Sequence, residues 1–187
     1  MGRQRTIDRE GLLDAAERVV VREGAAHLTL EAVASEAGIS KASVLYDYKT
    51  KRALVRALIE RRVGRERLRV QRFLEAEGSQ PNARIRAHLA ATSRSFSDDE
   101  RSVALNLCAA LAQDADLRAP VQQSLLDAVV EIERDSSHPR GALLAFLAIE
   151  GLMLLDWFGL HSFDKTERDR LIAEIGWLMV QSPSSAS

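Results

Sequence analysis

Apolar residues recur at helical spacing along nearly the whole sequence, and this periodicity restricts the fold more than any other feature. The first expected helix illustrates it, because one face would carry Leu12, Leu13, Ala16, Val19 and Val20. Gly24 follows at the point where such a helix would stop. No alternation of apolar and polar residues is long enough to indicate a strand. We therefore predict an all-α protein of about nine helices.

Capping residues divide the chain into segments. Thr29, Ser40 and Thr50 can each accept a hydrogen bond from the first turn of the helix that follows. Gly78 and Pro81 interrupt the helical pattern and mark a domain boundary. The expected helices after Gly24 cover 30–37, 41–47, 51 into the seventies, 82–96, 100–112, 117–134, 139–160 and 166–181.

This boundary predicts two domains and a tail. The first domain covers residues 1–54, and its last helix continues as a linking helix to about residue 76. The second covers 79–182, and the small polar residues 183–187 form a disordered tail. Cys108 is the only cysteine, which excludes a disulfide framework and a multi-cysteine metal site. No cofactor or metal is expected.

The net charge of −1 hides a division between the two parts of the chain. Residues 1–72 hold 16 Lys and Arg against 10 Asp and Glu, whereas residues 73–187 hold 10 against 17. A basic section suggests a polyanionic partner. Much of the excess lies in arginines after residue 51, which either steer the protein toward a polyanion or pair with the acidic second part.

Residues 141–160 are apolar enough to raise the question of a membrane span. Glu150 lies at the middle of this segment and Asp156 near its end, and a carboxylate there costs about 2.5–3.5 kcal/mol on insertion scales. We therefore expect a buried helix, part of which faces a second subunit. The polar, basic start of the chain lacks a secretory signal, so a cytoplasmic protein with no membrane partner is expected.

Residues 30–48 have the pattern of a helix-turn-helix. Ala34 is small where two helices would cross, and Gly38 suits the turn between them. The second helix would then present Lys41, Ala42, Ser43, Leu45, Tyr46 and Asp47. Such a helix is short enough to enter the major groove of DNA, which is about 12 Å wide.

The surrounding residues make this pattern more specific. From Thr6 to Leu58 the chain resembles the DNA-binding domain of the TetR family of bacterial transcriptional regulators. The matching motifs are Leu12 to Ala16, Gly24, Thr29, Ala34 to Ser40, Lys41 to Lys51, and Ala53-Leu54. The resemblance implies a homodimer with one helix-turn-helix per subunit, and a carboxy-terminal domain for ligand binding and dimerisation. It also implies a repressor that a small molecule, unidentified here, releases from a palindromic operator.

The resemblance implies a set of DNA contacts. Thr29 matches a phosphate contact at the start of the second helix, and Lys51 matches the family's lysine in the first turn of the fourth. A helix amino terminus attracts phosphate, which supports the second of these roles. The full set is Thr29, Ser40, Lys41, Ala42, Ser43, Tyr46 and Lys51. Tyr48 matches an aromatic residue that fills the domain core, and Arg3 and Arg5 could reach a minor groove.

Two positions depart from the family's pattern. Leu45 stands where many members have a tyrosine, so the hydroxyl contact is lost unless Tyr46 replaces it. Asp47 would repel phosphate, and it either accepts from a cytosine amine or points to solvent.

Polar groups on apolar helix faces indicate a ligand pocket in the second domain. The candidates are His88, Thr92, Phe96, Cys108, Leu125, Val129, Phe146, Glu150, Met153 and Trp157. Glu150 is the most informative, because a carboxylate in such a helix needs a partner or a raised pKa. It holds a cationic or hydroxylated ligand, pairs with His88 or Arg94, or lies exposed at a dimer edge. His88 and Cys108 could instead be ordinary core residues.

The last two helices carry an excess of apolar surface that predicts a four-helix dimer interface. The candidates are Leu144, Ala148, Gly151, Leu152, Leu155, Phe158, Leu171, Ile175, Leu178 and Met179. The alternative is that these faces pack only within the subunit.

Two other functions compete with a DNA-binding regulator. An all-helical enzyme is disfavoured, because the sequence contains no metalloprotease, nucleophile-elbow, Walker or dinucleotide motif. A helical protein-interaction module would retain the fold while Leu45 and Asp47 mark a degenerate DNA-reading head.

Overall fold

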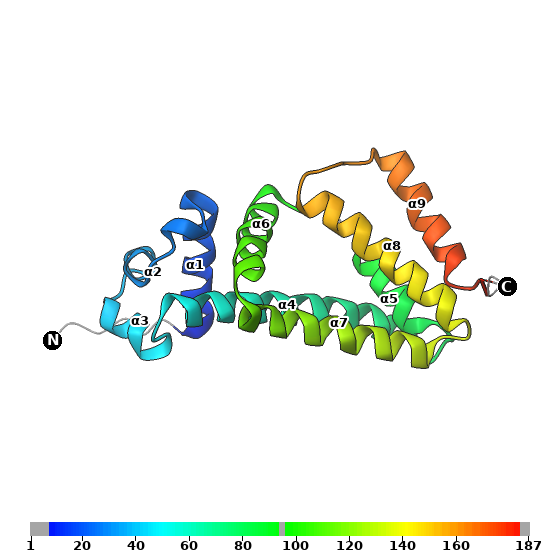
Figure 1. Cartoon of the computed structure of the whole chain (residues 1–187), viewed down its shortest axis with the longest axis horizontal. Coiled ribbons are helices and arrows are strands. Elements are labelled where there is room, and N and C mark those ends of the chain that lie inside the picture. The colour runs from blue at the N-terminus through cyan, green and yellow to red at the C-terminus, as the bar shows by residue number, and fades with distance from the viewer. Residues whose placement is uncertain (1–7, 94–95, 184–187) are drawn as a thin grey trace. The chain divides into compact units, whose positions relative to one another are not determined.

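The computed structural model describes residues 8–93 and 96–183, and every regular element in these ranges is helical. The expected arm at Arg3 and Arg5, the partner Arg94 and the end of the tail lie outside them. In chain order the elements are α1 (Arg9–Glu23), η1 (Ala25–His27), α2 (Leu30–Ala37), α3 (Lys41–Asp47), α4 (Lys51–Glu77), α5 (Ala83–Ala91), α6 (Asp98–Gln113), α7 (Ala115–Asp135), α8 (Pro139–Trp157) and α9 (Lys165–Leu178) (Figure 1).

The chain divides into two compact units, and each is described by itself. The first unit comprises Met1–Arg62 and Ser97–Val121, and the second comprises Val63–Phe96 and Gln122–Ser187. Helix α6 and the beginning of α7 therefore belong with the amino-terminal helices, although they follow α5 in sequence. Helices α4 and α7 each run from one unit into the other.

In the first unit, α1 packs against both α2 and α6. Asp8 caps α1 by accepting a hydrogen bond from the Gly11 N–H at 2.8 Å. The apolar face read from the sequence is buried, since Leu12, Val19 and Val20 are at most 1% exposed. Burial of this face is the main stabilising contribution of the helix.

The helix-turn-helix forms as its local signals predict. Thr29 accepts from the Ala32 N–H at 3.0 Å and starts α2, and Ser40 accepts from the Ser43 N–H at 3.1 Å and starts α3. Gly38 ends α2 in the left-handed conformation, with φ of 68°, which a residue with a Cβ rarely adopts. Val33 and Val44 are fully buried between the helices. One face of α3 is thereby packed against the domain, and the opposite face is exposed to solvent.

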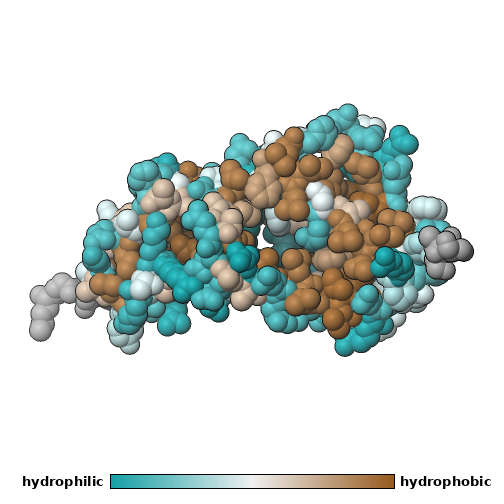
Figure 2. All heavy atoms as spheres, viewed as in Figure 1, coloured by the Kyte–Doolittle hydropathy of each residue, from teal (hydrophilic) through white to brown (hydrophobic). Residues whose placement is uncertain are grey.

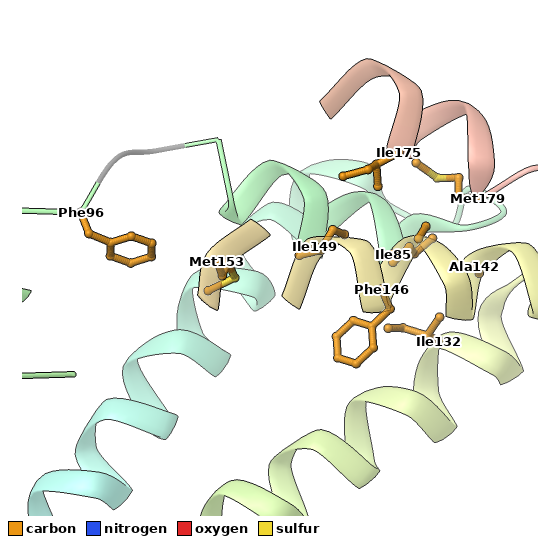
Figure 3. Packing of buried hydrophobic residues seen from close by; sticks show 10 residues of the cluster. Ile85, Phe96, Ile132, Ala142, Phe146, Ile149, Met153, Ile175 and Met179 are labelled. Atoms are coloured by element: carbon orange, nitrogen blue, oxygen red, sulfur yellow. The ribbon is translucent and has the colours of Figure 1, made fainter. Parts of the chain in front are cut away.

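In the second unit, a core cluster joins α5, α7, α8 and α9 (Figure 3). Phe146 of α8 lies beside Ile132 of α7, and Ile149 belongs to the same cluster. Gly141 allows α8 to approach the end of α9 closely, because a Cβ there would lie 2.2 Å from the Gln181 carbonyl oxygen. Asp156 and Arg168 form an ion pair at 3.8 Å between α8 and α9.

Several helix ends differ from the sequence prediction. Helix α5 ends at Ala91 instead of near Phe96; Thr92 is its C-cap, and the Thr92 hydroxyl donates to the His88 carbonyl at 2.8 Å. Helix α8 ends at Trp157, and Gly159 follows with φ of 60°. Asp164 caps α9 one residue earlier than expected, and α9 ends at Leu178. Helix α7 already begins at Ala115.

The apolar segment that forms α8 is not covered on every side within the chain. Its core face is buried, but Leu147 is 58% exposed and Leu154 is 45% exposed on the opposite face. Hydrophobic side chains also gather over α7 and α8 on the face of the second unit that Figure 2 shows. None of the helices within 8–93 and 96–183 combines the length and hydropathy of a membrane span.

Candidate nucleic-acid interface and ligand site

The first turn of α3 presents a polar surface to solvent. Lys41 and Ala42 are exposed, and the Ser43 hydroxyl lies 2.9 Å from that of Ser40. The Lys41 ammonium pairs with the carboxylate of Glu31 in the first turn of α2. This hydrogen bond lowers the pKa of Glu31. The cation at the tip of the helix is therefore partly neutralised by a carboxylate of the same motif.

Tyr46 continues this open face and is 80% exposed. The Lys49 ammonium lies 5.6 Å from the centroid of its ring, which is within the range of a cation–π interaction. Leu45 is half-buried beside it. An exposed aromatic ring with an adjacent cation can contact both a sugar–phosphate backbone and an apolar base edge.

Asp47 is neither fully exposed nor free of a protein partner. The Arg9 Nε donates to the Asp47 Oδ1 at 3.2 Å, and the Asp47 side chain is 20% exposed. The sequence missed this pairing, because Arg9 and Asp47 are far apart in the chain. Tyr48 is 7% exposed, as expected of a core residue, and burial raises the pKa of its phenol.

Lys51 lies at the start of α4, where Thr50 caps the helix by accepting from the Ala53 N–H at 3.0 Å. The Lys51 Nζ donates to the carbonyl oxygens of Ala25 and Ala26, at 2.9 and 3.1 Å. An ammonium has three N–H donors, so the third remains available for an anion. The η1 turn therefore holds a cation beside the amino terminus of α4, a position that suits a phosphate.

The expected ligand residues meet in part. Phe96, Phe146 and Met153 belong to the core cluster of the second unit, and Val129 and Trp157 pack against it (Figure 3). The ring of His88 contacts Phe146 edge-on at 5.3 Å between centroids, and Phe96 contacts Trp157 at 5.5 Å. The Thr92 hydroxyl lies 3.9 Å from the Met153 sulfur.

Two titratable groups of the second unit have shifted pKa values: His88, which contacts Phe146, and Glu150, one helical turn after Phe146 on α8. Burial, reinforced by the carboxylate of Glu66, raises the pKa of Glu150 to about 7. Burial, with a smaller contribution from Arg84, lowers the pKa of His88 to about 4. His88 is therefore neutral at pH 7 and does not supply a positive partner for Glu150, whereas Glu150 changes charge near neutrality.

Two of the expected ligand residues lie outside the cluster. Cys108 is on α6 in the first unit, and burial raises the pKa of its thiol. Leu125 is 42% exposed on α7. Two surface hollows of about 420 Å³ each lie on α9 and between α5 and α9, and neither is lined by the expected set.

The expected dimer residues differ in exposure. Leu152, Ile175 and Met179 are buried within the chain itself, at 5–8% exposure. The others, which are Leu144, Ala148, Gly151, Leu155, Phe158, Leu171 and Leu178, are half-buried. The most exposed apolar residues of these two helices, Leu147, Leu154 and Trp177, were not in the expected set. The same periodicity could have found them once the inward face of α8 was known.

Comparison with protein-family models assigns the chain to a family. The model described as "Bacterial regulatory proteins, tetR family" matches residues 12–58, and "Tetracyclin repressor-like, C-terminal domain" matches residues 82–178. The chain belongs to the TetR family. It is thus a TetR-family transcriptional regulator with a DNA-binding helix-turn-helix domain. A comparison with curated protein sequences returned no match.

Solved structures share the fold at low sequence identity. A transcriptional regulator from Rhodococcus sp. Rha1 aligns with a TM-score of 0.71 and 19% identity, over 92% of this chain and 96% of that one. A TetR transcription regulator from Haloarcula marismortui aligns with a TM-score of 0.69 and 18% identity, over 91% and 95%. The multidrug binding protein EbrR, complexed with malachite green, aligns with a TM-score of 0.71 and 19% identity, over 92% and 98%.

Proposed function

We propose that this TetR-family regulator is a homodimeric repressor that reads a palindromic operator with α3 and contacts phosphates at the starts of α2 and α4. The observation that carries the proposal is the split of α3 into a packed face at Val44 and an open face that includes Lys41 and Tyr46. Direct readout needs such an arrangement, because the helix must be fixed while its outer side chains reach base edges.

Each residue of the interface has a distinct proposed role. Lys41, Ala42 and Ser43 face base edges, with Ser40 fixing the first turn of α3. Tyr46 contacts the sugar–phosphate backbone or a thymine methyl group. Thr29 and Lys51 contact phosphates and therefore position the domain without reading sequence.

We propose that an apolar, aromatic ligand with a cationic group binds the carboxy-terminal domain and releases the DNA. The support is the group of aromatic side chains at Phe146 and Trp157, together with the carboxyl of Glu150 on the same helix. A cation would favour the ionised form of Glu150 and offset the cost of its burial. The related EbrR structure contains malachite green, an aromatic dye, which makes this compound a suitable probe.

We propose that the dimer forms through the outer faces of α8 and α9. Leu147, Leu154 and Trp177 are 45–64% exposed, and apolar patches of this kind on a soluble chain mark interaction surfaces. The hollow lined by Leu171 and Leu178 lies on the same helix as Trp177. A two-fold axis would place these faces against their own copies and form a four-helix interface.

Selection from a pool of random DNA duplexes tests the DNA-binding proposal. The full-length protein should enrich a palindromic sequence, and its affinity for that duplex should fall as salt rises. Lys51→Ala should weaken binding to every duplex, whereas Ser43→Ala should change the preferred bases. Failure to enrich any sequence would overturn the proposal and favour the protein-interaction module.

Thermal unfolding with malachite green tests the ligand proposal. The dye should raise the melting temperature of the wild type and release the selected duplex. Glu150→Gln should weaken both effects, while Leu125→Ala, on an exposed side chain, serves as the control. Equal effects of the dye on wild type and Glu150→Gln would exclude the carboxylate as the anchor.

A further inference from the structure

We propose that Asn106 of α6 is a positioning residue for DNA binding, which acts by holding the η1 turn that carries the ammonium of Lys51. This inference rests on the proposed function, because it requires Lys51 to contact a phosphate. The family resemblance assigns no role to Asn106. The contacts that carry the inference all lie within the first unit.

The side-chain amide of Asn106 is fixed at both ends. Its Nδ2 donates to the Ser102 carbonyl oxygen at 2.8 Å, one turn earlier on α6. This bond orients the amide so that Oδ1 faces η1, where it accepts from the Ala25 N–H at 2.8 Å. An amide that donates on one side and accepts on the other has a single favourable orientation.

The peptide groups of Ala25 connect α6 to α4. The Ala25 N–H binds Asn106, and the Ala25 carbonyl accepts from the Lys51 Nζ at 2.9 Å. The Ala25 carbonyl also accepts from the Leu28 N–H at 3.3 Å, and Leu28 is fully buried. The turn is therefore attached to the domain core on one side and to α6 on the other.

The direction of the chain between α1 and the turn depends on Gly24. Its φ is 81°, a conformation that residues with a Cβ rarely adopt, whereas a Cβ here would make only an ordinary contact, 3.6 Å from Asn106 Oδ1. The glycine thus allows the chain to leave α1 in a direction that brings the Ala25 N–H to the Asn106 side chain. The positive φ of Gly24 and the hydrogen bond from Ala25 to Asn106 therefore belong to the same local arrangement.

A second contact joins α6 to the first turn of α4. Arg52, the residue after Lys51, donates from Nε and Nη2 to the carboxylate of Asp114 at 2.6 and 2.8 Å. Asp114 directly follows α6 and caps its end. Asn106 and Asp114 therefore hold the two sides of the segment from which the Lys51 side chain extends. Asn106 binds the N–H of Ala25, the residue whose carbonyl accepts from the Lys51 ammonium.

The Asn106 contact affects DNA binding because it fixes the position of the Lys51 ammonium in the unbound protein. With the turn fixed, two of the three ammonium N–H groups are bound to carbonyls, which leaves one donor for an anion. Without the Asn106 contact, the Ala25 N–H loses its partner and the turn can move. The ordering of Lys51 must then occur on binding, which lowers affinity.

A double-mutant cycle on the full-length protein tests this inference. The probes are the duplex selected from the random pool and a random duplex. Asn106→Ala should weaken binding to both, roughly five- to tenfold, and should reduce the slope of log affinity against log salt by up to about one. In a Lys51→Ala background the same change should cost little more, because its effect passes through Lys51. Gln113→Ala, which removes an exposed amide from the same helix, should leave affinity unchanged.

A second variant removes the same hydrogen bond from the other partner. Ala25→Pro deletes the N–H donor, and the ψ of 162° at Gly24 is compatible with a following proline. It should reproduce the loss seen with Asn106→Ala, so the test does not depend on the folding of one variant. Thermal unfolding of each variant checks that the domain remains folded.

The outcomes separate this inference from the proposed function. If Lys51→Ala binds DNA as well as wild type does, the proposed phosphate contact fails. If Lys51→Ala weakens binding but Asn106→Ala and Ala25→Pro do not, the positioning role fails alone. Additive losses from Lys51→Ala and Asn106→Ala would also overturn it, since a merely structural role predicts additivity.

Discussion

The Nη1 of Arg61 on α4 lies 2.7 Å from the Oδ1 of Asp14 on α1, and the Arg61 side chain is only 5% exposed. The Nη2 of Arg61 lies 2.8 Å from the Oε1 of Glu17. Burial alone would lower the pKa of Arg61, but these two carboxylates raise it overall. The pairing keeps a charge within the first unit and fixes α4 to α1, so that the start of α4 has a defined position relative to the helix-turn-helix.

Replacing Arg61 should destabilise the amino-terminal unit. We expect Arg61→Ala to lower the free energy of unfolding by about 2–3 kcal/mol, because it removes a buried side chain together with its charge-assisted contacts to Asp14 and Glu17. Arg56→Ala, which removes an exposed pair with Glu60 on the same helix, should cost less than about 0.5 kcal/mol. Urea unfolding followed by circular dichroism measures both. Equal losses of unfolding free energy in Arg61→Ala and Arg56→Ala would mean that the burial of Arg61 adds nothing to stability.

Gly141 should tolerate no side chain. In Gly141→Ala the new Cβ would lie 2.2 Å from the Gln181 carbonyl oxygen and 2.7 Å from that of Leu178, so α8 and α9 must separate. We expect a loss of about 1–3 kcal/mol in the free energy of unfolding. Gly64→Ala, with no atom within 4 Å of the new Cβ, should instead stabilise α4 by up to about 1 kcal/mol. Thermal unfolding distinguishes the two signs.

Glu150 should make stability depend on pH. Its pKa is about 7 in the folded chain, above that of an exposed glutamate, so ionisation at high pH disfavours the folded state. Glu150→Gln should therefore be more stable than wild type at pH 8 by roughly 2–3 kcal/mol, and the difference should vanish toward pH 4.5. His88 acts in the opposite direction in both proteins, since its lowered pKa costs stability as pH falls from 6.5 toward 4. Melting temperatures compared pairwise across pH cancel the His88 effect, and a constant difference would contradict the prediction.

Glu31 should weaken DNA binding by pairing with Lys41. We expect Glu31→Gln to raise the affinity for selected and random duplexes alike by a few-fold. The reason is that Lys41 no longer has to break its ion pair with Glu31 before it contacts DNA. Glu36→Gln is the matched control on the same helix, since Glu36 pairs instead with Arg18 and Arg22. Fluorescence anisotropy across salt concentrations measures the affinities. A gain with Glu36→Gln equal to that with Glu31→Gln would indicate a general effect of charge.

The exposed apolar face of α8 should be needed for dimerisation. We expect Leu154→Glu to shift the protein from dimer to monomer in sedimentation experiments, because it places a charge on the exposed apolar face of α8 that the proposed interface buries. Leu68→Glu changes another exposed leucine, 61% accessible on α4, and should leave the dimer intact. A wild-type protein that sediments as a monomer would refute the proposed interface directly.

Local signals made the helix-turn-helix predictable. Thr29, Ser40 and Thr50 cap helices in the structure because a hydroxyl oxygen can satisfy N–H groups only a few residues away. Gly38 takes the left-handed conformation for an equally local reason. The ends of α5 and α8 were less predictable. The apolar spacing of both sequences continues beyond Thr92 and Phe158, the residues at which the two helices end.

By itself, the sequence determined the helical class, the helix-turn-helix and its capping residues, since these depend on periodicity and on contacts between near neighbours in the chain. Only the tertiary structure decided the partners of the charged groups. Lys51 meets Ala25, Arg9 meets Asp47, and Arg61 meets Asp14 across separations that no sequence pattern records. The attachment of Asn106 to η1 likewise required α6 to fold back beside α1, because a hydrogen bond forms only where distance and direction are both satisfied.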